Sequence, residues 1–120
     1  MSPLPLFVIL ALAFVALGLL RSIRYRMRRG LSMDQWNALK HRNALVVDVR
    51  TPSEFAAGAA PGSWNIPLDQ LPHRLSELPK DRPLVVCCAT GARSSHAKRF
   101  LEHAGFSDVH NAGPWQACLR

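Results

Sequence analysis

Cysteines, acidic residues and repeats are scarce in this chain, and each shortage narrows the class of protein. Three cysteines in 120 residues, with Cys87 next to Cys88, are too few for the disulfide framework of a secreted domain. They fit a reducing compartment, where free thiols persist. There is no internal repeat and no low-complexity tract outside one arginine cluster, so we expect a single small folded domain.

The shortage of acidic residues leaves a formal net charge of +7, but the basic excess is local. Five arginines lie within residues 21–29, and subtracting them leaves +2 for the rest of the chain. The basic balance therefore does not indicate nucleic-acid binding, and we expect no nucleic-acid partner. We interpret the arginine run as a clamp on anionic lipid headgroups.

Charge is absent altogether from residues 4–20, which are rich in Leu, Ala, Val, Phe and Ile. As a helix this segment would span roughly 25 Å, within the range of membrane-spanning helices. A signal peptide would need a basic start and a cleavage site, and a buried core helix would conflict with the arginines that follow. The pattern favours a single-pass anchor over residues 4–20, joined at Gly30 to a separate domain.

The arginine cluster also predicts orientation, because positive flanks stay on the cytoplasmic side. We therefore expect a bacterial-type inner membrane protein whose C-terminal domain is cytoplasmic. The predicted domain organisation is 1–29 for the transmembrane helix with its basic juxtamembrane segment, and 30–120 for the soluble domain.

Helix and strand signals alternate through the soluble part. Capping-box patterns begin at Ser32 and Thr51, and continuous apolar runs indicate buried parallel strands. Such alternation predicts an α/β sandwich with a mostly parallel sheet and a ligand site beyond the carboxyl ends of its strands. In chain order, we expect a short helix that opens at 32–35 and carries Trp36 and Leu39 on one face, strand 44–49, helix 51–58, strand 63–66, helix 68–78, central strand 84–88, helix 94–103, strand 107–110 and a helical turn at 114–119.

Cys88 stands at such a strand end, where a loop leads into a helix. A cysteine there is placed to be a thiolate nucleophile, because backbone N–H groups from residues 89–93 and the helix N-terminus can stabilise its charge. Gly91 permits the backbone conformations that turn amides inward, and Arg93 supplies a cation. The plainer alternative is that Cys88 is a small buried hydrophobe. The candidate loop reads Cys88, Ala89, Thr90, Gly91, Ala92, Arg93 and Ser94.

This loop resembles the active-site loop of the rhodanese family, whose pattern is Cys, two variable residues, Gly, one variable residue and Arg-Ser. The resemblance covers most of residues 31–120. The other matching segments are Asp48-Val49-Arg50, Glu54-Phe55, Gly58, Gly62-Ser63, Asn65-Ile66-Pro67, Leu101, Gly105-Phe106, Val109 and Trp115. The chain departs from the family pattern at Ala59-Ala60, at Cys87 and at Gly113-Pro114.

The resemblance implies a rhodanese-like three-layer sandwich and a sulfurtransferase. Cys88 would carry sulfane sulfur as a persulfide from a thiosulfate-type donor to cyanide or a thiol, including a protein thiol. No cofactor and no metal is implied. Asp48 and Arg50 are expected to form a structural ion pair near the site.

Two other functions stay open. Cysteine phosphatases and arsenate reductases have similar loops with five residues between cysteine and arginine. This chain has four, which predicts a smaller ring of amides that suits one sulfur atom better than a tetrahedral oxyanion. A catalytically silent rhodanese-like binding or regulatory module at the membrane is the other alternative.

Cys87 is expected to point away from Cys88, because side chains alternate along a strand. Cys118 and His96 are expected to take no part in the chemistry.

Overall fold

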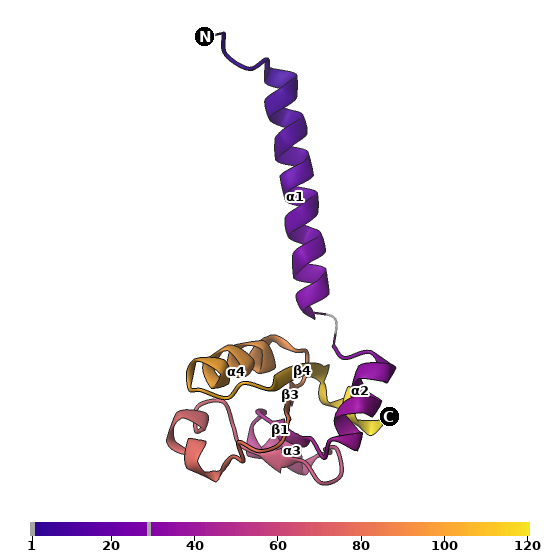
Figure 1. The fold of residues 1–120 in the computed structure, drawn as a ribbon, viewed down its shortest axis with the longest axis vertical. Coiled ribbons are helices and arrows are strands. Elements are labelled where there is room, and N and C mark those ends of the chain that lie inside the picture. The colour runs from indigo at the N-terminus through magenta and orange to yellow at the C-terminus, as the bar shows by residue number, and fades with distance from the viewer. Residues whose placement is uncertain (1, 29) are drawn as a thin grey trace.

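A long apolar helix precedes an α/β domain in the computed structural model, which describes residues 2–28 and 30–120, apart from the side chains of residues 26–28 (Figure 1). The helices are α1 (Leu6–Arg28), α2 (Met33–His41), α3 (Pro52–Ala56) and α4 (Ala92–His103). The strands are β1 (Leu45–Asp48), β2 (Trp64–Asn65), β3 (Leu84–Cys88) and β4 (Val109–Pro114). Short 3₁₀ turns occupy Leu71–His73, Leu75–Glu77 and Trp115–Leu119.

The four strands form one parallel sheet in the order β2-β1-β3-β4. Every residue of β1 and β3 is buried, as the continuous apolar runs predicted, because a parallel sheet is covered on both faces. The α/β architecture with a parallel sheet, predicted for this chain from its sequence, is therefore confirmed. Cys88 lies at the carboxyl end of β3, an interior strand of the sheet.

Alternation along β1 and β3 divides the buried residues into two cores, one on each face of the sheet. The first core contains Cys88 and packs against α4, and the second contains Cys87 and packs against α2 and the C-terminal 3₁₀ turn. The predicted opposite orientation of the two neighbouring cysteines is confirmed. Central members of the first core are Val47, Val86, Ile66, Leu71 and Leu101, and those of the second are Val46, Val85, Trp36, Leu39, Ala112 and Cys118.

Both predicted capping boxes are present. Ser32 accepts a hydrogen bond from the Gln35 amide at the start of α2 while the Gln35 side chain binds the Ser32 amide. Thr51 and Glu54 make the same reciprocal pair at α3, with Pro52 in the first turn. These local contacts satisfy amides that a helix leaves unpaired, so the helix starts agree with the prediction.

The predicted helix over 68–78 is wrong, because the segment forms only two 3₁₀ turns. Pro72 has no N–H to donate and disfavours a helical backbone at the preceding residue, so an α-helix does not propagate there. Leucines spaced like a helix face nevertheless reach the first core, with Leu71 fully buried.

The bounds of α4 and of the last strand also differ from the prediction. The helix after the loop begins at Ala92, two residues earlier than expected, because Gly91 with φ of 102° turns the chain directly into it. The last strand is Val109–Pro114 rather than 107–110, since pairing with β3 continues past an irregularity between Val86 and Cys87 to the pair Cys88 and Pro114.

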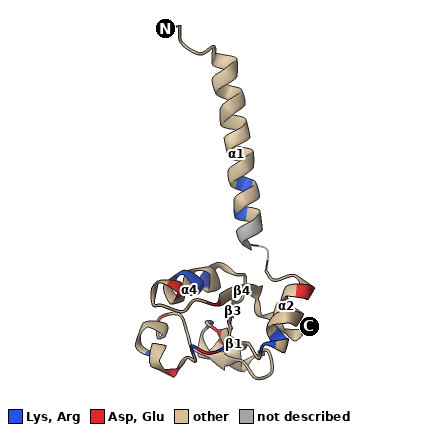
Figure 2. Ribbon diagram, viewed as in Figure 1, with Lys and Arg blue, Asp and Glu red and all other residues tan. Residues whose placement is uncertain are grey.

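Helix α1 is long and apolar enough over Leu6–Tyr25 to cross a membrane, and no part of that segment is buried in the protein. Its 20 residues would span about 30 Å, the thickness of a hydrocarbon core. The helix begins later than residue 4 and continues through the basic run, where Arg21 and Arg24 lie on its domain-side half (Figure 2). Arg29 and the side chains of Arg26 and Arg28 lie outside the described residues.

Candidate functional site

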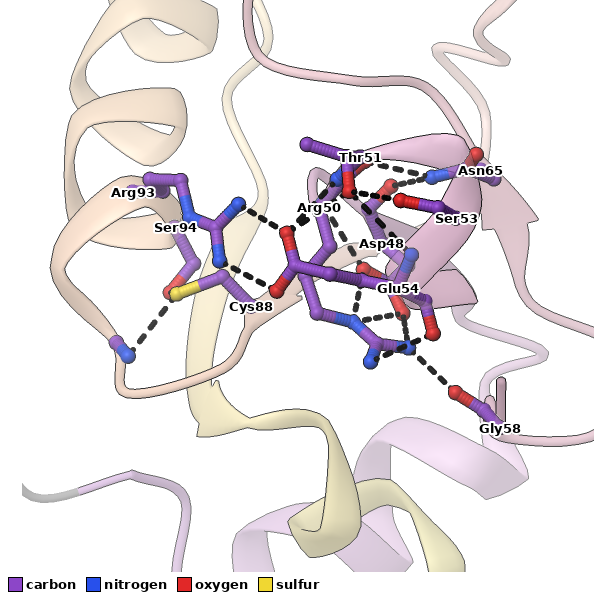
Figure 3. Close-up of polar contacts among 11 residues, drawn as sticks. Asp48, Arg50, Thr51, Ser53, Glu54, Gly58, Asn65, Cys88, Arg93 and Ser94 are labelled. Carbon is purple, nitrogen blue, oxygen red and sulfur yellow. Dashed lines mark hydrogen bonds and ion pairs between the residues drawn. The ribbon is translucent and has the colours of Figure 1, made fainter. Parts of the chain in front are cut away.

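The Cys88 sulfur is enclosed by the loop that follows β3 (Figure 3). The Gly91 amide donates a hydrogen bond to Sγ at 3.0 Å, and Cys88 itself is 0% exposed. Gly91 adopts φ of 102°, and a Cβ added there would lie 3.3 Å from the Gly113 Cα. Glycine is therefore required at position 91 both by the backbone conformation that aims the amide and by the approach of β4.

Ser94, in the first turn of α4, supplies a second polar contact to the sulfur. Its buried hydroxyl lies 3.4 Å from Cys88 Sγ. Burial alone would raise the pKa of the Cys88 thiol, but the Ser94 hydroxyl and the amides of Ser94, Gly91 and Thr90 outweigh it and lower that pKa below its ordinary value. The site is thus arranged to hold a sulfur anion with backbone and hydroxyl dipoles.

The amide that donates to the sulfur, that of Gly91, lies within the predicted run 89–93. Ser94, whose hydroxyl and amide also lower the pKa of Cys88, lies one residue beyond that run. The side chains of Ala89, Thr90 and Ala92 are exposed, which leaves only their backbone to shape the loop. His96 is exposed on α4, and Cys118 is buried in the second core.

Arg93 does not point at the sulfur but at Glu54 on α3 (Figure 3). Its two terminal nitrogens donate to the two carboxylate oxygens at 2.7 and 2.9 Å, and both side chains remain about one-third exposed, at 36% and 35%. The paired guanidinium and the Thr51 contacts lower the pKa of Glu54 to about 2. Sequence reasoning treated Glu54 only as a capping and motif residue, because nothing local links it to a residue 39 positions away.

Asp48 and Arg50 form a buried ion pair beside this loop. Arg50 Nη2 donates to Asp48 Oδ2 at 2.7 Å and to the Gly58 carbonyl at 2.7 Å, and Nη1 reaches the Glu54 carbonyl at 3.3 Å. The guanidinium also lies 4.8 Å from the centre of the Trp115 ring. Arg50 therefore ties α3, and Glu54 with it, to the end of β1.

Asn65 is a further residue whose role the sequence did not reveal. Its side-chain amide donates to the carbonyls of Asp48 and Arg50 at 3.0 and 2.9 Å, which fixes the bend after β1. The only sequence signal was its place in a motif of the resembled family.

A small recess of about 280 Å³ borders Arg93 and is lined by Val49, Thr51, Pro67, Leu68 and Asp69. Another hollow, of about 1030 Å³, lies instead between the 30–32 linker, the end of β4 and the C-terminal turn. We regard the smaller recess as the relevant one, because it adjoins the loop and the larger one contains none of the loop residues. Within residues 2–28 and 30–120 no three His, Cys, Asp or Glu side chains gather in a way that could hold a metal ion.

Comparison with known proteins agrees with this geometry. A model of the Rhodanese-like domain family matches residues 32–113. The chain belongs to the rhodanese-like family. A protein named sulfurtransferase from Allochromatium vinosum is 44% identical over 69 residues, which cover 58% of this chain and 64% of that protein. Thiosulfate sulfurtransferase GlpE of Stutzerimonas stutzeri is 35% identical over 78 residues, covering 65% of this chain and 72% of GlpE.

Solved structures show the same fold. A rhodanese-related protein from Thermoplasma volcanium has a TM-score of 0.64 at 31% identity, over 76% of this chain and 90% of that one. The human single-domain sulfurtransferase TSTD1 has a TM-score of 0.62 at 28% identity, over 75% of this chain and 94% of that one. Together the relatives support a sulfurtransferase at the level of the family.

Proposed function

We propose that this protein transfers sulfane sulfur as a persulfide on Cys88. The Cys88 thiolate attacks the outer sulfur of a thiosulfate-type donor, the donor's S–S bond breaks, and sulfite leaves with the bonding electrons. A thiolate or cyanide then attacks the outer sulfur of the persulfide, takes it, and regenerates the Cys88 thiolate. The observation that carries this proposal is the pair of donors on Cys88 Sγ, the Gly91 amide and the Ser94 hydroxyl.

The size of the loop supports sulfur rather than phosphate as the transferred group. Four residues separate Cys88 from Arg93, and the amides that lower the pKa of Cys88 gather around a single atom. A persulfide is one sulfur longer than a thiolate and carries one charge, which such a ring can stabilise as an anion-binding nest.

Mass spectrometry after exposure to thiosulfate tests the proposal. The full chain in mild detergent, carrying Cys87→Ala so that the assignment is unambiguous, should gain one sulfur atom on the Cys88 peptide and lose it on addition of cyanide. Absence of the gain would leave the silent binding module as the better interpretation. Hydrolysis of an aryl phosphate faster than sulfur transfer would instead favour the phosphatase alternative.

We propose in addition that α1 anchors the domain, which begins at Gly30, to a bacterial-type inner membrane with the domain in the cytoplasm. The unburied apolar segment Leu6–Tyr25 and the arginines after it support this topology. The protein should stay with membranes in high salt, which releases purely electrostatic binders. Protease added to intact spheroplasts should spare the domain and degrade it after lysis; salt release, or degradation before lysis, would contradict the topology.

A further inference from the structure

The cation of the candidate loop is already occupied by a carboxylate. Arg93 presents its two terminal nitrogens to the two Glu54 oxygens in parallel, the strong bidentate arrangement of guanidinium and carboxylate. An anionic sulfur donor that approaches Arg93 therefore meets a neutralised pair rather than a free positive charge.

Glu54 is held in this position from three sides. Its Oε1 accepts hydrogen bonds from the Thr51 amide and hydroxyl at 3.3 and 3.0 Å, and its carbonyl accepts one from Arg50. Because its pKa is about 2, the carboxylate stays ionised throughout the physiological range. The negative charge beside the loop is thus both fixed in place and permanent.

The neighbouring groups add little positive charge to compensate. Arg50 is paired with Asp48, and the recess that borders Arg93 is also lined by Asp69. The groups that contact the sulfur itself, the Gly91 amide and the Ser94 hydroxyl, are dipoles without net charge. Such dipoles can stabilise one sulfur anion at contact distance but attract a distant dianion only weakly.

We propose that Glu54 is a specificity-determining residue that directs this site away from doubly charged inorganic donors and toward sulfane sulfur carried by singly charged or uncharged organic groups. This inference rests on the proposed sulfur transfer and concerns the choice of donor. The carboxylate acts through Arg93, so it is a positioning residue whose effect grows with the charge of the donor.

Glu54→Gln is the variant that isolates this effect. Glutamine retains an oxygen that can accept from Thr51, so the capping box survives while the charge is lost. We expect KM for thiosulfate, a dianion, to fall on the order of tenfold and KM for benzenethiosulfonate, a monoanion, roughly threefold, because Coulomb energy scales with donor charge. In each case the outer sulfur is transferred, with sulfite or benzenesulfinate as the leaving group, and kcat should change little.

Alkylation of Cys88 tests the same charge effect without any sulfur transfer. Iodoacetate carries a negative charge and iodoacetamide does not. Both reagents reach the buried sulfur only after the same opening of the loop, so the contribution of that opening cancels in the ratio of their rates. Glu54→Gln should raise the iodoacetate-to-iodoacetamide ratio roughly threefold. Glu77→Gln removes an exposed carboxylate paired with Arg74, far from the loop in sequence, and should leave the ratio unchanged.

The two readouts separate failure of this inference from failure of the proposed function. If the wild-type chain transfers no sulfur but the alkylation ratio rises in Glu54→Gln, the charge effect stands and the sulfur-transfer proposal falls. An unchanged ratio overturns the inference, and so does an equal fall in KM for both donors, since a change indifferent to charge reflects a wider opening of the loop. Circular dichroism of the variant confirms that it is folded.

Discussion

Cys87 and Cys88 are adjacent in β3 and equally buried, yet the two faces of the sheet give them opposite chemistry. On the first face the Ser94 hydroxyl and loop amides lower the pKa of Cys88 against the effect of burial. On the second face the Cys118 thiol, burial and the nearby Asp48 carboxylate raise the pKa of Cys87. The Cys88 thiol is therefore easier to ionise than an ordinary cysteine, and the Cys87 thiol is harder to ionise.

Burial by itself therefore does not decide whether a cysteine is reactive. A buried thiol becomes a thiolate only where donors are aimed at it, and here the donors lie where β3 ends and α4 begins. The second face is instead closed by Trp36 and Leu39, with the buried Asp48–Arg50 pair beside them.

Replacement of the two cysteines should have very unequal effects on activity, and the larger one is the largest effect that we expect. We expect Cys88→Ser to reduce thiosulfate sulfurtransferase activity on the order of a thousandfold or more, because a hydroxyl is a far weaker nucleophile at neutral pH. Cys87→Ala should retain most of the rate. Steady-state assays with thiosulfate and cyanide measure both, and comparable activity in Cys88→Ser would refute the assignment.

Asp48→Asn should weaken the second face by disrupting its buried ion pair with Arg50. Removing one charge of a buried pair leaves Arg50 uncompensated, and we expect a loss of about 3 kcal/mol in the free energy of unfolding. Urea unfolding of the full chain in mild detergent, followed by tryptophan fluorescence, measures it. Asp34→Asn, an exposed carboxylate in α2, serves as control, and an equally small change in both variants would show that the pair is dispensable.

Gly30→Ala tests how the linker from α1 meets the second face. A Cβ at position 30 would lie within van der Waals overlap of the backbone carbonyl of Ala112, a residue of the second core. We expect a loss of about 1–3 kcal/mol by the same unfolding measurement. Gly18→Ala is the control, because its methyl group would lie in open space. If Gly30→Ala were as stable as Gly18→Ala, the linker would have moved away from Ala112 without loss of stability.

Ser94→Ala should have the smallest effect, and it tests whether the hydroxyl lowers the pKa of Cys88. Loss of the hydroxyl removes a stabilising contact to the thiolate, so the pKa of Cys88 rises and less thiolate is present at neutral pH. Alkylation by iodoacetamide at pH 7 should slow on the order of tenfold and recover as the pH is raised. The neighbouring Ser95→Ala is the matched control. A pH profile of alkylation that is unchanged in Ser94→Ala would show that the Ser94 hydroxyl does not lower the pKa of Cys88.

Much of the local structure follows from short stretches of sequence. The capping boxes at Ser32 and Thr51, and the apolar runs of β1 and β3, depend on residues within a few positions of one another, and the predictions at these places hold. The prediction of a helix over 68–78 was wrong because it gave more weight to the spacing of the leucines than to Pro72. A helix propagates only where backbone N–H groups can donate, and proline has none.

The candidate site likewise has features that neighbouring residues predict and features that depend on distant residues. The order Cys88, Gly91, Arg93 and Ser94 predicts a loop around a sulfur anion, and in the structure these residues follow β3 with the Gly91 amide directed at the Cys88 sulfur. The partner of Arg93 could not be predicted, since Glu54 reaches it only after α3 is tied to the end of β1 by Arg50. Nor did any spacing indicate that Cys118 would lie beside Cys87 in the second core.

The apolar N-terminal helix, the alternation of strands and helices, and the cysteine at a strand end can be predicted from the sequence, because each is encoded by neighbouring residues and their polarity. The tertiary structure was needed to show which charges neutralise one another, which positions must be glycine, and which of two adjacent thiols has its pKa lowered. Those outcomes depend on distances between residues remote in the chain, and such distances exist only after the sheet has brought β1, β3 and β4 together.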